Sequence, residues 1–223
     1  MRRKRNKEIQ RERTMKLFID SADEIIMSEG VESLSIRKVA NCAGYNSATL
    51  YNYFDNLEHL VYFTYMKKVK AFYLIFSTTQ DEQEALEDLK RYWLSLTKMC
   101  FHYPHEMKVL LYAEYCVQFQ SILKDYLEIY SDLIDSCVAE KILDMFEEGL
   151  TNPLTVALLR LAEEFSLSFD TMNELKTIVE TFLRGIADRQ DSDDRFNSYE
   201  TFLKISEDFI EKMIDVYLLS TAF

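Results

Sequence analysis

Apolar residues recur at intervals of three and four along the chain, which is the spacing of one face of a helix. Leu17, Phe18, Ala22 and Ile25 form the first such stripe, and the helix that they predict ends near Gly30. The pattern therefore favours helix from the beginning of the chain.

Two short helical patterns follow the first one, and a glycine separates them. Ser35 is a good N-cap for the first short pattern, and Gly44 ends it. Asn46 caps the second pattern, whose inner face contains Leu50 and Phe54. The first 56 residues therefore predict three helices.

The rest of the chain carries longer helical patterns. The pattern over residues 60–76 is polar on its other side. Further helices are predicted at 82–102, from Pro104 onward, at 121–148, after Pro153, and at two amphipathic stretches, 175–186 and 202–216. A polar loop at 191–194 separates the last two, and Asn197 is the expected N-cap of the final helix.

Charge is divided unevenly along the chain. The net charge is −12, yet the first 16 residues contain eight basic and two acidic side chains. Residues 1–70 hold 13 basic and nine acidic side chains, whereas the remainder holds 13 basic and 29 acidic ones. Because phosphates attract the first part and repel the second, a nucleic-acid duplex would be met by the N-terminal end.

The stretch over residues 34–54 has the pattern of a helix-turn-helix. This motif needs small residues where its helices cross, a glycine-like turn, and apolar residues that hold the second helix on the first. These positions are filled by Ala40, Ala43, Gly44, Leu50 and Phe54. The outer side is then left to short or flat groups that can approach bases and phosphates, namely Ser47, Ala48, Thr49, Tyr51 and Asn52. A helical hairpin that touches no DNA is the alternative interpretation.

These patterns predict an all-α protein. A chain of 223 residues that is 48% hydrophobic can bury a sizeable core, and only four glycines and two prolines interrupt it. We expect a three-helix DNA-binding domain at residues 1–56, beginning with a frayed basic arm at 1–8. A larger helical domain for effector binding and dimerisation is expected at residues 57–223.

The helix-turn-helix stretch resembles the DNA-binding domain of TetR-family regulators. The family's pattern is matched in order and without gaps at Ser35, Arg37, Val39, Ala40, Ala43, Gly44, Leu50, Tyr51, Tyr53, Phe54, Glu58 and Leu60. The close resemblance covers residues 10–65. Beyond them, only the number, length and placement of helices are similar, with a weak likeness at 182–186 to the end of the family's first dimerisation helix.

The resemblance implies roles for individual residues of the motif. Arg37 would reach a base or a phosphate, and Tyr51 would donate a hydrogen bond to a phosphate. Ser47 and Thr49 would contact bases or nearby phosphates. The full predicted DNA-binding set is Ser35, Arg37, Ser47, Ala48, Thr49, Tyr51, Asn52 and Tyr53.

The chain departs from the family pattern at three positions. Ala48 replaces a common glycine, and Asn46 replaces a serine while still capping the helix. Leu57 replaces a lysine that pairs with phosphate, which lowers the expected number of phosphate contacts. We hypothesise that the basic residues of 1–13 supply charge instead, by following a groove or the DNA backbone.

Aromatic and sulfur-containing residues gather in the middle of the chain. They form ordinary core, or they line a pocket for a small apolar or aromatic molecule, as the family resemblance implies, and both can hold at once. The predicted effector-binding residues are Tyr65, Phe72, Trp93, Cys100, Tyr103, Met107, Leu111, Phe119 and Tyr126.

The last two helices are expected to pair with their copies in a second chain as a four-helix bundle. Gly185 lies inside a helical pattern, where glycine costs about 1 kcal/mol relative to alanine. Close approach of two helices would explain it, and chance tolerance is the alternative. The predicted dimer interface contains Ile178, Phe182, Gly185, Phe202, Phe209 and Met213.

Several kinds of chemistry lack support in the sequence. No Ser/His/Asp or Cys/His arrangement and no glycine-rich phosphate loop occurs, so we expect no catalytic residues and no enzyme. Pro104 interrupts the pair His102 and His105, and the four cysteines include no C-x-x-C pair, so neither a metal nor a cofactor is expected. The thiols should be buried and free. The chain shows neither a signal peptide nor an apolar run that spans a membrane, which predicts a cytoplasmic protein.

These observations favour a homodimeric regulator that binds a palindromic double-stranded DNA operator. Repression is the commoner outcome in the family, with release by a small apolar or aromatic effector. The alternative keeps the fold without a small-molecule sensor, and acts through DNA and a protein partner. An enzyme in the helical body is a third, weaker possibility.

Overall fold

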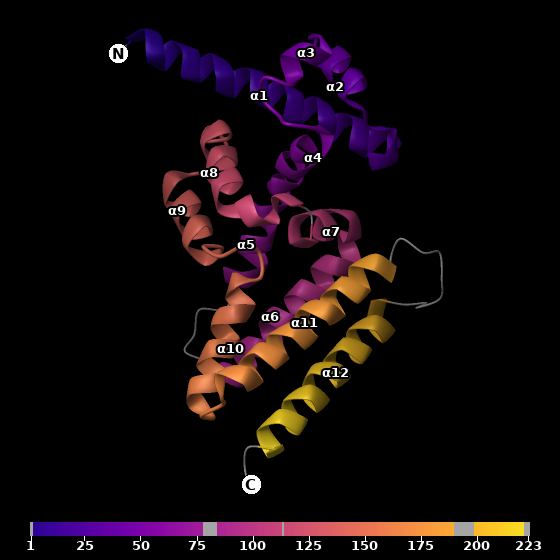
Figure 1. Cartoon of the computed structure of the whole chain (residues 1–223), viewed down its shortest axis with the longest axis vertical. Coiled ribbons are helices and arrows are strands. Elements are labelled where there is room, and N and C mark those ends of the chain that lie inside the picture. The colour runs from indigo at the N-terminus through magenta and orange to yellow at the C-terminus, as the bar shows by residue number, and fades with distance from the viewer. Residues whose placement is uncertain (1, 78–83, 113, 190–198, 221–223) are drawn as a thin grey trace. The chain divides into compact units, whose positions relative to one another are not determined.

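The structure is a computed structural model that describes residues 2–77, 84–112, 114–189 and 199–220. Within these ranges every regular element is a helix, as predicted (Figure 1). The elements, with η for a 3₁₀ turn, are α1 (Arg2–Glu29), η1 (Val31–Ser33), α2 (Ile36–Cys42), α3 (Ser47–Leu50), α4 (Leu57–Tyr65), η2 (Met66–Lys68), α5 (Val69–Ser77), α6 (Ala85–His102), α7 (Pro104–Tyr112), η3 (Glu114–Gln118), α8 (Phe119–Ile129), α9 (Ser136–Met145), α10 (Asn152–Glu164), α11 (Phe169–Arg189) and α12 (Tyr199–Ser220).

The chain forms two compact units. The first contains residues 1–69 and 114–144, and the second contains residues 70–113 and 145–223. The helix-turn-helix lies in the first unit together with α4 and α8. The predicted domain boundary at residue 56 stays a prediction.

Helix α1 is the longest helix of the first unit, and it begins earlier than expected. The basic arm at residues 1–8 was expected to fray, but α1 starts at Arg2. The reason is that Arg, Lys, Gln and Glu all favour helix, and no glycine or proline occurs before Gly30. Gly30 then ends the helix with φ of 87°, a backbone conformation that side chains with a Cβ disfavour.

Helix α4 packs against α1 and α8 within the first unit. Every side chain from residue 60 to residue 66 is buried, so the polar side that the pattern predicted is missing here. Two helices cover α4, and an element covered on two sides gains from apolar groups all around. The single helix expected over 60–76 is also interrupted by the 3₁₀ turn η2.

Helices α8 and α9 replace the single helix expected over 121–148. The break falls at residues 130–135, where polar side chains offer the backbone alternative partners. Asp135 Oδ1, for example, accepts a hydrogen bond of 2.9 Å from the backbone N–H of Cys137. Tyr130 after α8 donates a 2.6 Å hydrogen bond to Asp20 of α1, and Lys16 of α1 pairs with Asp132 at 2.9 Å.

The second unit is built around α6, which contacts α7, α10, α11 and α12 (Figure 1). Trp93 of α6 is fully buried, and its indole N–H lies 2.8 Å from Ser206 Oγ and 3.0 Å from the Ser206 carbonyl oxygen. Its ring centroid lies 5.0 Å from that of Phe182 and 5.6 Å from that of Phe209. Because these rings come from α6, α11 and α12, they join the three helices in one aromatic core.

A buried carboxylate joins α6 to α10. Asp88 accepts a 2.8 Å hydrogen bond from Arg91 Nη2 and also pairs with Arg160 of α10. A buried charge is tolerated when it is paired and hydrogen-bonded in this way. The cluster fixes the position of α10 along α6.

The cysteines differ in part from the expectation of buried thiols. Cys100 is buried and burial raises its pKa to about 12, but Cys42 and Cys137 are exposed. Both exposed cysteines lie on short helices, Cys42 on α2 and Cys137 on α9. Among the described helices, none is both long and apolar enough to cross a membrane.

Candidate nucleic-acid interface

The helix-turn-helix is held together by residues that are almost completely buried. Val39 and Ala40 of α2, Leu50 of α3 and the following Phe54 are each at most 1% exposed. Phe18 of α1 lies beneath them, with its ring centroid 6.4 Å from that of Phe54. These are the contacts that the motif requires, so the geometry of the predicted helix-turn-helix is present.

The two short helices begin at side-chain caps. Ser35 Oγ accepts a 3.3 Å hydrogen bond from the backbone N–H of Lys38. Asn46 Oδ1 accepts 2.8 Å and 3.0 Å hydrogen bonds from the backbone N–H and the hydroxyl of Thr49. Gly44 has φ of 77° and makes the turn between the helices. Because α3 has only four residues, it depends on this cap and on Leu50 for its position.

Most of the predicted DNA-binding residues lie on the outer surface. Tyr51 is 56% exposed, although the preceding Leu50 is 0% exposed. The other exposed members of the set are Ser35, Arg37, Ala48 and Asn52, and Ser47 and Thr49 are half-buried. The structure therefore brings seven members of the set to the outer side of α2 and α3.

Tyr53, the eighth member, has a different environment. Its ring is half-buried, with its centroid 5.8 Å from that of Phe18. Arg11 of α1 covers the ring, its guanidinium carbon 5.2 Å from the ring centroid, and Arg11 Nη1 donates a 3.3 Å hydrogen bond to the carbonyl oxygen of Asn52. Sequence reasoning did not find this contact, and its only signal is that Arg11 lies two helical turns before Phe18.

The outer surface can donate hydrogen bonds to an anion. Arg37 is exposed and forms no ion pair or hydrogen bond with another residue in the described part of the chain. The neighbouring Lys38, in contrast, pairs with Glu29 at 2.5 Å. An exposed guanidinium in the same motif as an exposed phenol and a small methyl group suits the phosphates and base edges of a major groove.

Helix α4, which follows the motif in the chain, begins with a third side-chain cap. Asn56 Oδ1 accepts a 2.8 Å hydrogen bond from the backbone N–H of His59, and its amide nitrogen donates to Tyr115 Oη at 3.0 Å. The His59 ring stacks on the Tyr115 ring with centroids 4.6 Å apart. His59 Nδ1 also accepts a 3.2 Å hydrogen bond from the backbone N–H of Asp55.

The environment of His59 favours its neutral form. Burial lowers its pKa below the usual 6.5, and the carboxylates of Asp55 and Asp125 oppose that effect in part. The neutral ring keeps the lone pair on Nδ1 that the Asp55 N–H needs.

The predicted effector-binding residues are divided between the two units. Tyr65, Phe119 and Tyr126 belong to the first unit and are buried. The other six belong to the second unit, and four of these are also buried, while Tyr103 and Leu111 are half-buried. In that unit the ring centroids of Phe72 and Tyr103 lie 6.3 Å apart.

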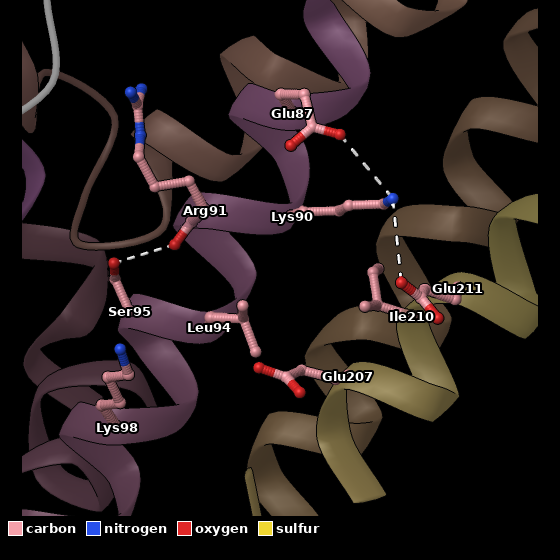
Figure 2. A pocket seen from close by; sticks show the side chains of 9 residues that line it. All are labelled: Glu87, Lys90, Arg91, Leu94, Ser95, Lys98, Glu207, Ile210 and Glu211. Carbon is pink, nitrogen blue, oxygen red and sulfur yellow. Dashed lines mark hydrogen bonds and ion pairs between the residues drawn. The ribbon is translucent and has the colours of Figure 1, made fainter. Parts of the chain in front are cut away.

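A groove of about 460 Å³ lies between α6 and α12, and none of the predicted effector-binding residues lines it. Figure 2 shows Lys90 reaching from α6 between Glu87 and Glu211, with N···O distances of 3.7 Å and 3.9 Å. The lining is mostly charged and consists of Glu87, Lys90, Arg91, Leu94, Ser95, Lys98, Glu207, Ile210 and Glu211.

The predicted dimer residues lie on α11 and α12. Phe182 and Phe209 stack on each other with centroids 4.1 Å apart, and Phe202 lies 5.2 Å from Phe101 of α6. Met213 is buried, and Ile178 is half-buried. Gly185 is exposed, and an added Cβ there would meet no atom within 4 Å. The dimer interface stays a prediction.

Comparisons with known proteins agree with the motif. Residues 18–61 match the family model of bacterial regulatory proteins of the tetR family. A search of the curated proteins finds no match.

Similar solved structures include a TetR family transcription regulator from Marinobacter aquaeolei VT8, with 17% identity, a TM-score of 0.45, and coverage of 96% of this chain and 98% of that one. Another is the fatty acid degradation regulator FadR from Bacillus halodurans, with 16% identity, a TM-score of 0.45, and coverage of 88% and 93%. Likeness at this level says nothing about a ligand.

The family match over residues 18–61 includes the buried framework of the helix-turn-helix and the exposed residues that it presents. Residues 18–61 therefore form a helix-turn-helix DNA-binding domain of the tetR family of bacterial regulatory proteins.

Proposed function

We propose that this regulator is a homodimeric repressor that binds a palindromic operator and is released by a small apolar or aromatic effector. The observation that carries the DNA-binding part is the contrast between Leu50, which is 0% exposed, and Tyr51, which is 56% exposed. Burial of the first residue anchors α3, and the neighbouring phenol is left free for a partner.

Each exposed residue has a role that its chemistry supports. Arg37 donates to a phosphate or to a guanine edge, and Tyr51 donates to a phosphate. Ala48 approaches a thymine methyl group, and Ser47 and Asn52 contact bases or nearby phosphates. The Thr49 hydroxyl donates its hydrogen bond to Asn46 Oδ1. Toward DNA, the Thr49 oxygen can therefore act only as an acceptor.

Dimerisation through α11 and α12 gives two such surfaces related by a two-fold axis. Support comes from apolar side chains that α12 leaves exposed, Ile205 at 41% and Val216 at 66%, and from the open space around Gly185. Two recognition surfaces about 34–36 Å apart would meet successive major grooves of one duplex.

Effector release requires a path from the second unit to the motif. The helical residues 57–77 run from α4 in the first unit, through η2, to α5 in the second. An effector that binds more tightly when residues 57–77 adopt one orientation than when they adopt another would shift the spacing of the two DNA-binding motifs in the dimer. Phe72 and Tyr103 are aromatic candidates for the effector site in the second unit.

A second candidate function omits the small-molecule effector. Phe72, Trp93, Cys100 and Met107 are all 0% exposed, as expected for solid core. The groove beside α6 carries mostly charged groups, which do not suit an apolar ligand. In this case the regulator would respond to a protein partner.

The main test is selection of random DNA duplexes on the purified protein. We expect a two-fold symmetric consensus with half-sites one helical turn apart, and no enrichment would contradict the proposal. Arg37→Ala and Tyr51→Ala should each weaken binding of the selected duplex while the melting temperature stays unchanged. Sedimentation should give a dimer, and a thermal-shift screen with apolar and aromatic molecules separates the two candidates.

A further inference from the structure

The groove between α6 and α12 is a candidate binding site that contains none of the predicted effector-binding residues. Both helices belong to the second unit, and the volume of about 460 Å³ is in the range of small-molecule pockets. The charged side chains of its lining are three cations and three anions, namely Lys90, Arg91, Lys98, Glu87, Glu207 and Glu211. The lining is therefore polar without net charge, although residues 71–223 as a whole are strongly acidic.

Buried hydrogen bonds join the two helices that form the groove. The indole N–H of Trp93 on α6 donates to Ser206 Oγ of α12 at 2.8 Å, and the Thr97 hydroxyl lies 2.9 Å from the same oxygen. All three residues are buried. The groove is thus formed before any ligand arrives, and a preformed site loses less entropy on binding.

Most charged groups of the groove already have partners. Lys90 Nζ lies 3.7 Å from Glu87 and 3.9 Å from Glu211, as Figure 2 shows, and Arg91 pairs with the buried Asp88 at 2.8 Å. These groups balance one another and leave little charge for a ligand.

The two remaining charged groups are Lys98 and Glu207. Both are exposed, and within the described ranges of the chain neither forms an ion pair or a hydrogen bond with another residue. They come from opposite walls, and in the view of Figure 2 Leu94 lies between them. Ile210, which is buried, adds a second aliphatic side chain to the lining. The groove therefore offers one ammonium group, one carboxylate and an aliphatic surface.

We infer that the groove binds a small zwitterion with an aliphatic side chain, an amino acid or a dipeptide. The ligand carboxylate pairs with Lys98, the ligand ammonium group pairs with Glu207, and the aliphatic side chain covers Leu94 and Ile210. A diamine would be repelled by the three cations of the lining, and a dicarboxylate by the three anions. This ligand differs in class from the proposed apolar or aromatic effector.

Titration calorimetry of the purified protein with leucine and with the dipeptide leucyl-leucine tests the inference. We expect at least one of these zwitterions to bind, and the comparison shows which separation of the two charges fits. The N-acetyl and amide forms of the ligand that binds each lack one charge. Each form should bind about tenfold more weakly, because one charge-assisted hydrogen bond is lost.

Variants of the two unpaired residues locate the site. Lys98→Gln and Glu207→Gln should each weaken binding about tenfold, and thermal unfolding checks that these exposed changes leave the fold intact. The matched controls are Lys212→Gln and Asp208→Asn, which remove exposed charges of α12 outside the groove. Because solvent and salt screen such charges, affinity should change by no more than about twofold.

Three results would overturn the inference: no binding of either zwitterion at millimolar concentration, equal binding of the forms with one charge blocked, or equal weakening by the control variants. Failure to select a DNA duplex would contradict the proposed function instead, since binding in the groove is measured without DNA.

Discussion

Replacing Leu50 with alanine tests how much the burial of this one residue contributes to holding α3 in place. Leu50 is 0% exposed and is the one buried residue of a four-residue helix. Truncating a fully buried leucine costs about 2–5 kcal/mol, and we expect about 3 kcal/mol because α3 has no length of its own to keep it folded. That loss is a large share of the stability of an ordinary domain, which is about 5–15 kcal/mol.

The control is the adjacent residue. Tyr51→Ala removes a side chain that is 56% exposed, so the free energy of unfolding should change by no more than about 0.5 kcal/mol. It should nevertheless weaken DNA binding by about tenfold, as loss of a hydrogen bond to a charged phosphate does.

Urea unfolding followed by circular dichroism, together with duplex binding at fixed salt concentration, separates the two effects. Leu50→Ala should lower both stability and DNA affinity, and Tyr51→Ala should lower affinity alone. The reasoning is refuted if the Tyr51 variant is as unstable as the Leu50 variant, or if Leu50→Ala leaves the unfolding midpoint unchanged.

Three further predictions concern contacts of the first unit. Asn46→Ala removes both bonds to Thr49 and should cost about 1 kcal/mol in urea unfolding, and Asn46→Asp should restore most of it. Because burial lowers the pKa of His59 in the folded state, the folded protein binds fewer protons than the unfolded chain does. Its stability should therefore be full above about pH 6.5 and fall as the pH decreases through the folded pKa, and His59→Gln should flatten that decrease in pH-dependent thermal unfolding. Tyr130→Phe removes the 2.6 Å hydrogen bond to Asp20 and should cost about 1–2 kcal/mol while the salt slope of DNA binding stays the same; a changed slope would show that this contact acts on the DNA surface.

The helix-turn-helix could be predicted because its signals are local. Ser35 and Asn46 are caps that act within three residues, and Gly44 supplies a backbone conformation that few other residues adopt. Such signals depend little on the rest of the fold. The same reasoning predicted the end of α1 at Gly30 and the restart after Pro153.

Features that depend on contacts distant in sequence could not be predicted. Residues 114–144 join the DNA-binding unit through partners such as Asp20 and Asn56, which no local pattern reveals. Burial on every side of α4 has the same origin. The early start of α1 was a different error, since charge was interpreted as disorder although the residues at 2–13 favour helix.

The sequence pattern also fails to separate the possible roles of the aromatic residues. The family resemblance placed Trp93 among the predicted effector-binding residues, and Phe182 and Phe209 were predicted at a dimer interface; both stay predictions. The three rings lie within 6 Å of one another in a single core. Aromatic residues on helices have the same periodicity whether they face a neighbouring helix, a ligand or a second chain, so the pattern alone cannot separate these roles.

Trp93 is the only tryptophan of the chain, and this makes it a built-in optical reporter. Its indole is shielded from water and hydrogen-bonded to Ser206, so its fluorescence should be emitted at short wavelength and be quenched poorly by iodide or acrylamide. Any molecule that separates α6 from α11 or α12 would admit water to the ring and shift the emission to the red. A search for effectors can therefore begin with unlabelled protein, before any operator sequence is known.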